Sequence, residues 1–256
     1  MKKFLKTLGV CIGFPILNLI LVGFIQGFFL GYTNSNIELL NKNIFYLTIA
    51  GDVLTLILII IMLIPSGFGL LKRINIKKID FKEYIYILVF SVAVSIILLF
   101  LAGILSQLIP GYNNVSKTLS GARQSIVQTI IAVIFIPIYE EILFRGIIFG
   151  YLRKNFNIYL AIFGQALIFA FMHLNLVQGI YTFILGIILA LVYMESKSIL
   201  GNITMHIVFN LFGMVIVPLF LSKHVFILMG LLIFSIAIMI FIAIKVLKKY
   251  EYSLYR

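Results

Sequence analysis

The stretch IVQTIIAVIFIPIYEEILFRGIIF, residues 126–149, decides how this sequence is interpreted. It is long and apolar enough to form a membrane-spanning helix, because about 20 apolar residues cover the ~30 Å of bilayer hydrocarbon. Yet it contains two adjacent carboxylates, Glu140 and Glu141, and a guanidinium, Arg145. A charge at the bilayer centre costs about 2.5–3.5 kcal/mol on insertion scales, so these charges need compensation. Such residues usually line a cavity or a functional site.

The rest of the chain has the composition of a membrane protein. Its 256 residues are 63% hydrophobic and 11% charged, whereas soluble domains are about half apolar and about a quarter charged. Eight apolar blocks follow one another, at about 4–31, 44–71, 84–108, 125–151, 157–173, 176–194, 199–221 and 225–246. The sequence therefore predicts an all-α fold: a polytopic membrane helical bundle of about eight transmembrane helices, forming a single domain over residues 1–256.

The distribution of basic residues predicts the orientation of this bundle. The net charge of +12 comes with no groove-reading motif, and we expect no nucleic-acid partner. With a cytoplasmic N-terminus, most Lys and Arg residues fall on the inner side of the membrane, in segments 1–6, 72–83, 152–156, 195–198 and 247–256. Because cytoplasmic loops are enriched in Lys and Arg, we expect an even number of spans with both termini in the cytoplasm.

Helical spacing separates the roles of the two adjacent carboxylates. Glu141 and Arg145 are four residues apart, with the acid first, which favours an ion pair along the helix. Glu140 is rotated from Glu141 by about 100° and can face another helix. We interpret one carboxylate as structural and the other as having a separate function.

A few more polar residues lie within the apolar blocks. His173 ends the fifth block, in FAFMH, and His206 lies in the seventh, in HIVFN. Asn210 follows His206 by one turn on the same helix face. Asp52 lies in the second block, has no second membrane aspartate with which to pair, and is expected near the outer surface.

Three motifs in this order resemble one family. Glu-Glu-x-x-x-Arg in EEILFR, Phe-x-x-x-His in FAFMH and His-x-x-x-Asn in HIVFN are similar to the motifs of the CPBP family. This family includes the type II CAAX prenyl endopeptidases, bacterial Abi proteins, and bacteriocin-processing or self-immunity proteins. The resemblance covers about residues 125–221, the expected catalytic core helices, while residues 1–110 form additional N-terminal transmembrane helices.

The resemblance implies an intramembrane endopeptidase that hydrolyses a peptide bond in a membrane-associated or lipidated peptide or protein. Glu140 would activate the attacking water, which His173 helps to hold. His206 and Asn210 would stabilise the oxyanion, and the Glu141–Arg145 pair would shape the site. Amide hydrolysis does require a base for water and donors for the oxyanion. Since no Ser, Cys or Thr is placed as an obvious nucleophile, direct attack by water is favoured.

The sequence leaves a metal cofactor as an alternative. His173, His206 and Glu140 could supply three zinc ligands and leave a fourth position for water. No His-Glu-x-x-His pattern occurs, and Asn210 is a poor zinc ligand. We therefore favour a glutamate-activated water without a cofactor.

The depths of the candidate residues agree only in part. His206 lies about 10 Å and Glu140 about 16 Å from the predicted inner ends of their helices, which are compatible depths. His173, in contrast, falls near the predicted outer end of its block. Either the fifth helix is tilted and displaced inward, or its predicted boundaries are wrong.

Other functions compete with a peptidase. The chain could be a non-enzymatic membrane immunity or scaffold protein that retains the motif geometry, or a transporter with a buried proton relay, although no internal repeat supports a transporter. Usage rich in Ile, Lys and Asn favours a low-GC bacterium. We therefore expect a multi-pass protein of a bacterial plasma membrane, whose partners are the lipid bilayer and a pheromone, bacteriocin or membrane-protein substrate.

Overall fold

The computed structural model describes residues 2–64 and 74–254, and the side chains of residues 3–64 and 74–242. The end of the second predicted block, residues 65–71, and the first residues of the predicted loop 72–83 lie outside this part. Helical elements, with η marking π-helical turns, follow in the order α1 Lys2–Leu8, η1 Gly9–Gly13, α2 Phe14–Tyr32, α3 Ile37–Leu63, α5 Phe81–Leu108, α6 Tyr112–Ala122, α7 Ile126–Ile130, η3 Ile131–Phe135, α8 Ile136–Glu141, η4 Ile142–Phe149, α9 Gly150–Asn155, α10 Ile158–Phe171, α11 Leu176–Ser196, α12 Ile199–Leu211, η5 Phe212–Leu221 and α13 Val225–Leu254.

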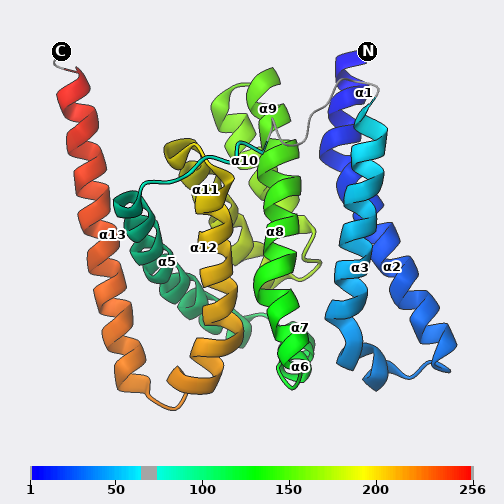
Figure 1. The fold of residues 1–256 in the computed structure, drawn as a ribbon. Coiled ribbons are helices and arrows are strands. Elements are labelled where there is room, and N and C mark those ends of the chain that lie inside the picture. Colours follow the sequence, from blue (N-terminus) through cyan, green and yellow to red (C-terminus); the bar gives the residue numbers. More distant parts are fainter. Residues whose placement is uncertain (1, 65–73, 255–256) are drawn as a thin grey trace.

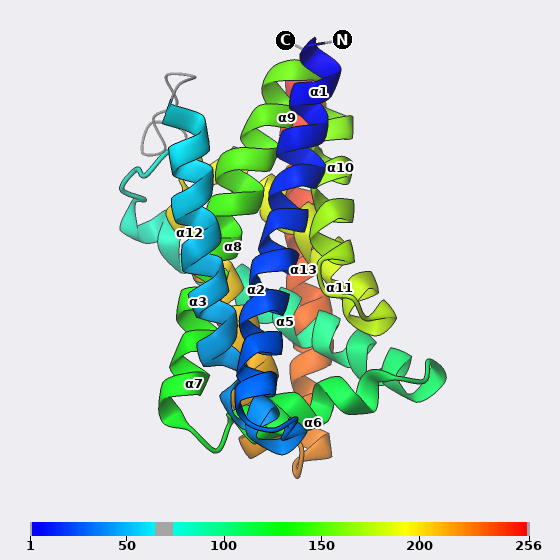
Figure 2. The same cartoon turned by 90° about the vertical axis from the view of Figure 1, so that its right-hand side faces the viewer.

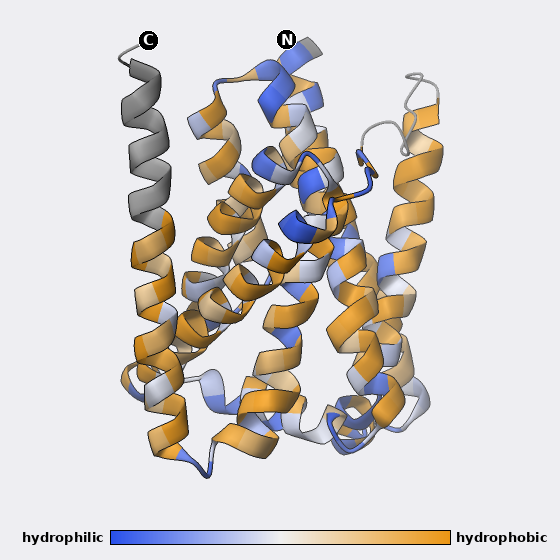
Figure 3. Ribbon diagram, turned by 60° about the vertical axis from the view of Figure 1, so that its left-hand side comes forward, coloured by the Kyte–Doolittle hydropathy of each residue, from blue (hydrophilic) through white to orange (hydrophobic). Residues whose placement is uncertain are grey.

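Several of these elements join end to end into longer helices. The joined helices are Lys3–Tyr32, Ile126–Asn155 and Ile199–Leu221. Together with α3, α5, α11 and the start of α13, they make seven helices in the described part that are long and apolar enough to cross a membrane. Hydrophobic residues cover these helices, whereas hydrophilic residues gather toward the connections (Figure 3). The predicted all-α membrane bundle is confirmed, and the chain is a multi-pass membrane protein.

The fifth predicted block forms a helix that is too short to cross the membrane. α10 has 14 residues, which span about 21 Å at a rise of 1.5 Å per residue, less than the ~30 Å of bilayer hydrocarbon. Asn157 caps its start by accepting a hydrogen bond from the backbone N–H of Leu160. α11 then returns alongside α10 as a helical hairpin (Figure 2). Within the described residues, each of the eight blocks therefore contains a helix, and seven of these helices have the length of a span.

The two ends of the described chain lie on the same side of the bundle. α1 begins and α13 ends at the top of Figure 1. The long helix that contains α8 stands between the α2–α3 hairpin and the group of α5, α12 and α13 (Figure 1). α6 runs across the opposite side of the bundle (Figure 2). Termini on one side agree with the expected even number of passes, because the short α10 makes an eighth, incomplete pass beside the seven spans. The cytoplasmic location of the termini stays a prediction.

Glycines allow two pairs of neighbouring helices to approach closely. At Gly186 of α11, an added Cβ would lie 3.0 Å from both Cα and Cβ of Ala166 in α10. At Gly51 of α3, an added Cβ would lie 2.5 Å from Cγ2 and 2.9 Å from Cα of Val22 in α2. Small residues at such crossings favour helix packing in membranes, where no hydrophobic force draws helices together.

We expect Gly51→Ala to lower the thermal stability of the detergent-purified protein. The added methyl group must displace the backbone of Val22, and overpacking of this kind costs about 1–3 kcal/mol. Gly23→Ala is the matched control, because nothing lies within 4 Å of a Cβ at that position and Ala has the better helix propensity. Equal melting temperatures for the two variants would contradict the packing described here.

Candidate active site

Four ionisable side chains meet where α8 and η4 pack against α12. Arg145 Nη1 donates to Glu141 Oε1 over 2.9 Å, and both side chains are fully buried. His206 Nδ1 lies 2.8 Å from the same oxygen, while His206 Nε2 lies 3.4 Å from Glu140 Oε2. The ion pair that the spacing predicts between Glu141 and Arg145 is confirmed. His206 connects it to the second carboxylate.

The helical hairpin of α10 and α11 closes over the guanidinium. Arg145 Nη2 donates to the carbonyl of Gly186 over 3.4 Å, and Gln165 Nε2 donates to the same carbonyl over 2.8 Å. The ring of Phe169 lies 4.8 Å from Arg145 Cζ, as a cation–π contact. Arg145 Nε and Glu141 Oε2 have no hydrogen-bond partner in the described part of the chain. Each of these two charges therefore depends on the other for compensation.

Phe169 also orders the two histidines. Its ring makes edge-to-face contacts with His173 at 5.0 Å and with His206 at 5.8 Å between ring centroids. Its backbone carbonyl lies 2.9 Å from His173 Nδ1. Because a carbonyl oxygen only accepts, Nδ1 carries the proton of this bond, which leaves a lone pair on Nε2 of the neutral ring.

Glu140 and His173 line the same cavity, which has a volume of about 150 Å³. The Glu140 side chain is 20% exposed, whereas that of Glu141 is completely buried. Glu140 is therefore the carboxylate of this pair that a water molecule or ligand can reach. The helix geometry predicts this division between the two acids.

The short α10 explains how His173 reaches this cavity. The helix ends within the bundle, and the chain reverses directly after His173 through Leu174, whose φ of 51° is left-handed. His173 therefore lies beside the middle of the helix Ile126–Asn155, not at the far membrane surface. The conflict in depth is resolved by the length of α10.

Asn210 stands apart from the charged cluster. It lies one turn after His206 on α12, as its spacing predicts, but its Nδ2 donates to the carbonyl of Ala132 in η3 over 3.0 Å. It does not line the cavity at Glu140. Four of the six predicted site residues, Glu140, Glu141, Arg145 and His206, are therefore in direct contact. His173 lines the same cavity as Glu140, and Asn210 lies next to the cluster along α12.

The sequence interpretation missed two polar residues at this cavity, Asn18 and Asp52. Asp52 is only 3% exposed, and Asn18 Nδ2 donates to Asp52 Oδ1 over 2.9 Å. The expectation that Asp52 lies near the outer surface is wrong. α3 begins at Ile37 instead of residue 44, which places Asp52 about 22 Å along the helix. The sequence did contain a signal for this contact, because Asn18 and Asp52 are polar residues within two neighbouring apolar blocks.

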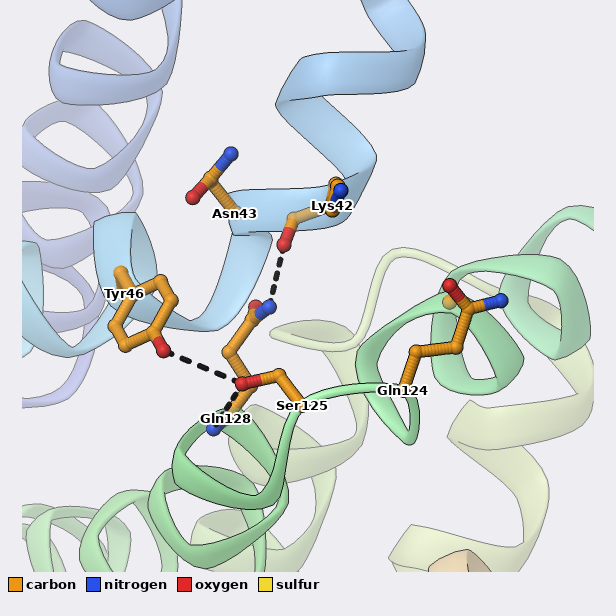
Figure 4. A pocket seen from close by; sticks show the side chains of 7 residues that line it. Lys42, Asn43, Tyr46, Gln124, Ser125 and Gln128 are labelled. Atoms are coloured by element: carbon orange, nitrogen blue, oxygen red, sulfur yellow. Dashed lines mark hydrogen bonds between the residues drawn. The ribbon is translucent and has the colours of Figure 1, made fainter.

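A larger cavity, of about 250 Å³, lies between α3 and the α6–α7 connection and contains none of the predicted site residues. Figure 4 shows the amide of Gln128 bonded to the carbonyl of Lys42, and the hydroxyls of Tyr46 and Ser125 in contact. Ser125 also caps α7. These contacts tie α3 to α7, so we interpret the region as structural.

The residues of the zinc alternative, His173, His206 and Glu140, are not grouped as a set of metal ligands in the part of the chain that the structure describes. Within residues 3–64 and 74–242, no three His, Cys, Asp or Glu side chains are grouped closely enough to hold a metal ion. Both ring nitrogens of His206 face carboxylate oxygens, whereas a zinc ligand needs a free lone pair on the imidazole.

Comparisons with known proteins agree with the motifs. Residues 122–212 match the family model of the Rce1-like type II CAAX prenyl endopeptidases. The family resemblance is thereby confirmed for the segment that contains all six predicted site residues. UPF0177 protein YvdC of Lactococcus lactis subsp. lactis (strain IL1403) is 28% identical over 198 residues, which cover 71% of this chain and 74% of that protein. No solved structure gives a significant match. The family match supports a function of the CAAX-type intramembrane protease kind.

We expect Arg145→Met to destabilise the protein strongly, because it leaves the buried Glu141 without its main counter-charge. Breaking a buried ion pair from one side costs about 3–5 kcal/mol. The double variant Arg145→Met/Glu141→Gln should recover part of this loss, since neither charge then remains alone. Thermal unfolding in detergent of both single variants and the double variant measures the coupling.

Arg153→Met is the control for this cycle, because Arg153 is an exposed arginine near the end of the same long helix. It should change the melting temperature little. If the double variant loses as much stability as the two single variants together, the two buried charges do not compensate each other.

Proposed function

We propose that the protein is an intramembrane endopeptidase in which water activated by Glu140 hydrolyses a peptide bond of a membrane-associated or lipidated peptide or protein. The observation that carries this proposal is the shared cavity of Glu140 and His173 beside a buried charged cluster. The family match over residues 122–212 supports the same reaction class.

The cavity offers two acceptors that can orient one water molecule. The Glu140 carboxylate accepts one water proton, and the lone pair on His173 Nε2 accepts a hydrogen bond from the other. The water oxygen then presents its own lone pair to the carbonyl carbon of the substrate. As the C–O bond forms, Glu140 takes the first proton and a tetrahedral oxyanion develops.

Two donors on α12 are suited to stabilise this oxyanion. A protonated His206 donates from both ring nitrogens. Its positive charge, together with that of Arg145, balances the negative charges of Glu140 and Glu141. Its Nε2 is 3.4 Å from Glu140, long for a charge-assisted hydrogen bond, so this N–H can donate to a stronger acceptor placed beside it. Asn210 lies outside the cavity and uses one amide proton on Ala132, so its second amide proton would reach the oxyanion only if that oxygen points toward α12.

Collapse of the intermediate completes the reaction. The C–N bond breaks, and the proton held by Glu140 moves to the leaving nitrogen. The products are a carboxylic acid and an amine, and Glu140 returns to its carboxylate form. Since water attacks directly, no covalent acyl-enzyme is required.

The surroundings of the site favour a hydrophobic substrate. The cavity lies among membrane-spanning helices, and Leu19, Val22 and Ile136 contribute to its walls. A lipid-modified or transmembrane peptide segment can approach such a site from the bilayer. The bacterial relative supports a location in a bacterial plasma membrane, where peptide pheromones, bacteriocins and membrane proteins are the candidate substrates.

We expect Glu140→Gln to lower the rate of peptide cleavage by about 10²–10⁴-fold, the usual contribution of a general base. The assay uses purified protein in proteoliposomes with a farnesylated peptide ending in a CAAX sequence and with an unmodified transmembrane peptide, and mass spectrometry detects the products. Glu38→Gln, which changes an exposed acid in the first turn of α3, should cleave normally.

Normal cleavage by both Glu140→Gln and His206→Ala would refute this peptidase mechanism. A cellular immunity phenotype that Glu140→Gln preserves in full would instead favour the non-enzymatic alternative, since Gln keeps the shape of Glu and removes the base.

We expect cleavage to persist in 1,10-phenanthroline, and the purified protein to contain much less than one zinc ion per chain. The reason is that both ring nitrogens of His206 face carboxylate oxygens. Elemental analysis and the cleavage assay provide the two measurements. About one zinc per chain that disappears in His173→Ala would establish the metal-dependent alternative.

A further inference from the structure

The cavity at Glu140 has a second polar wall that the mechanism above does not use. Asn18 from α2, Thr48 and Asp52 from α3, and Tyr139 from α8 contribute to it. The first three lie outside the segment that matches the family model. The N-terminal hairpin of α2 and α3 therefore supplies part of the same chamber.

The hydrogen bonds of this wall converge on the aspartate. Asn18 Nδ2 donates to Asp52 Oδ1 over 2.9 Å and also approaches Thr55 Oγ1 at 3.2 Å. The Thr55 hydroxyl donates to the carbonyl of Gly51 over 2.7 Å. Within the described residues, only Oδ1 of Asp52 receives a hydrogen bond. The second carboxylate oxygen remains available to an occupant of the cavity.

Tyr139 adds a further hydrogen-bonding group to this wall. The side chain is 6% exposed, lines the cavity, and comes directly before the catalytic candidate Glu140. Its hydroxyl lies near Thr55 and Asn18 but makes no hydrogen bond of good geometry in the described part of the chain. Buried polar groups are rarely left without a partner, so the hydroxyl has capacity for a ligand or a water molecule.

Packing alone does not account for these residues. Polar side chains often join neighbouring transmembrane helices, and the bond from Asn18 to Asp52 does connect α2 to α3. A second amide would serve that purpose without the cost of an ionisable group in the membrane. The carboxylate also lines the cavity that contains the proposed base, which a purely structural contact does not require.

We propose that Asp52, positioned by Asn18, binds the amino group that peptide-bond cleavage releases. This inference rests on the proposed function. The leaving nitrogen takes the proton from Glu140 and then the proton of the newly formed carboxylic acid, so that the products are a carboxylate and a cationic ammonium group. A carboxylate in the same cavity provides the charge-assisted hydrogen bond that such a group prefers. Before cleavage, the second carboxylate oxygen of Asp52 accepts a hydrogen bond from the N–H of the scissile amide. The Tyr139 hydroxyl forms a hydrogen bond with a neighbouring peptide group of the substrate.

The test uses a pair of product-like probes, the tripeptide Val-Leu-Ser with a free amino group and its N-acetylated form. Their affinities for the detergent-purified full-length protein are measured by isothermal titration calorimetry. The wild-type protein should bind the free amine about tenfold more tightly, a ratio that equals about 1.4 kcal/mol. In Asp52→Asn this preference should disappear, and in Asn18→Ala it should decrease.

Gln26→Ala is the matched control. Gln26 also joins α2 to α3, through a 3.4 Å contact of its Nε2 with Thr48 Oγ1, but it does not line the cavity. It should retain the tenfold preference. A purely structural role of Asp52 would lower the melting temperature of Asp52→Asn and leave the ratio of the two affinities unchanged.

The outcomes separate this inference from the proposed function. An absent preference in the wild type, or the wild-type preference in Asp52→Asn, overturns the role of Asp52 even if cleavage depends on Glu140. Conversely, normal cleavage by Glu140→Gln overturns the proposed mechanism, whatever the probes show. In the cleavage assay, the free tripeptide should inhibit the wild type about tenfold more strongly than it inhibits Asp52→Asn.

Discussion

The site depends on the mutual neutralisation of buried charges inside a membrane bundle. Glu141 is held between Arg145, one turn later on the same long helix, and His206 from α12. Charges in a medium of low dielectric are tolerated when they are paired and hydrogen-bonded, and removal of either partner is expensive. The pairing therefore fixes α12 against the helix Ile126–Asn155. It also leaves the neighbouring Glu140 partly exposed and available for chemistry.

Aromatic and backbone groups complete this environment. Phe169 touches Arg145 and both histidines, and its carbonyl sets the protonation of His173 at Nδ1. The main chain between Ile126 and Asn155 is π-helical on either side of α8. π-helical turns often occur at functional sites because they shift side chains relative to a regular helix. The acids thus occupy a locally irregular part of an otherwise long helix.

Most of the fold follows from local sequence, and part of the site does as well. Long apolar blocks fix the helices, and the four-residue spacing of Glu141 and Arg145 fixes their ion pair. The depth of His173 could not be predicted, because the turn after α10 contains no Gly or Pro and places Leu174 in a left-handed conformation. The position of Asp52 was also missed, since the polar residues at the start of α3 concealed where the helix begins. The contact of Asn210 with Ala132 depends on tertiary packing that spacing does not reveal.

The termination of α10 within the bundle has a consequence for how this chain can change in length. His173 lies two residues past the end of a helix whose start is fixed by the Asn157 cap. One inserted or deleted residue in α10 would rotate the imidazole by about 100° and shift it by about 1.5 Å, away from the carboxylate that it faces across the cavity. Insertions in the polar connection between α5 and α7 carry no such cost to the imidazole. Insertions and deletions among homologues should therefore be rare in α10 and more frequent in the connection between α5 and α7.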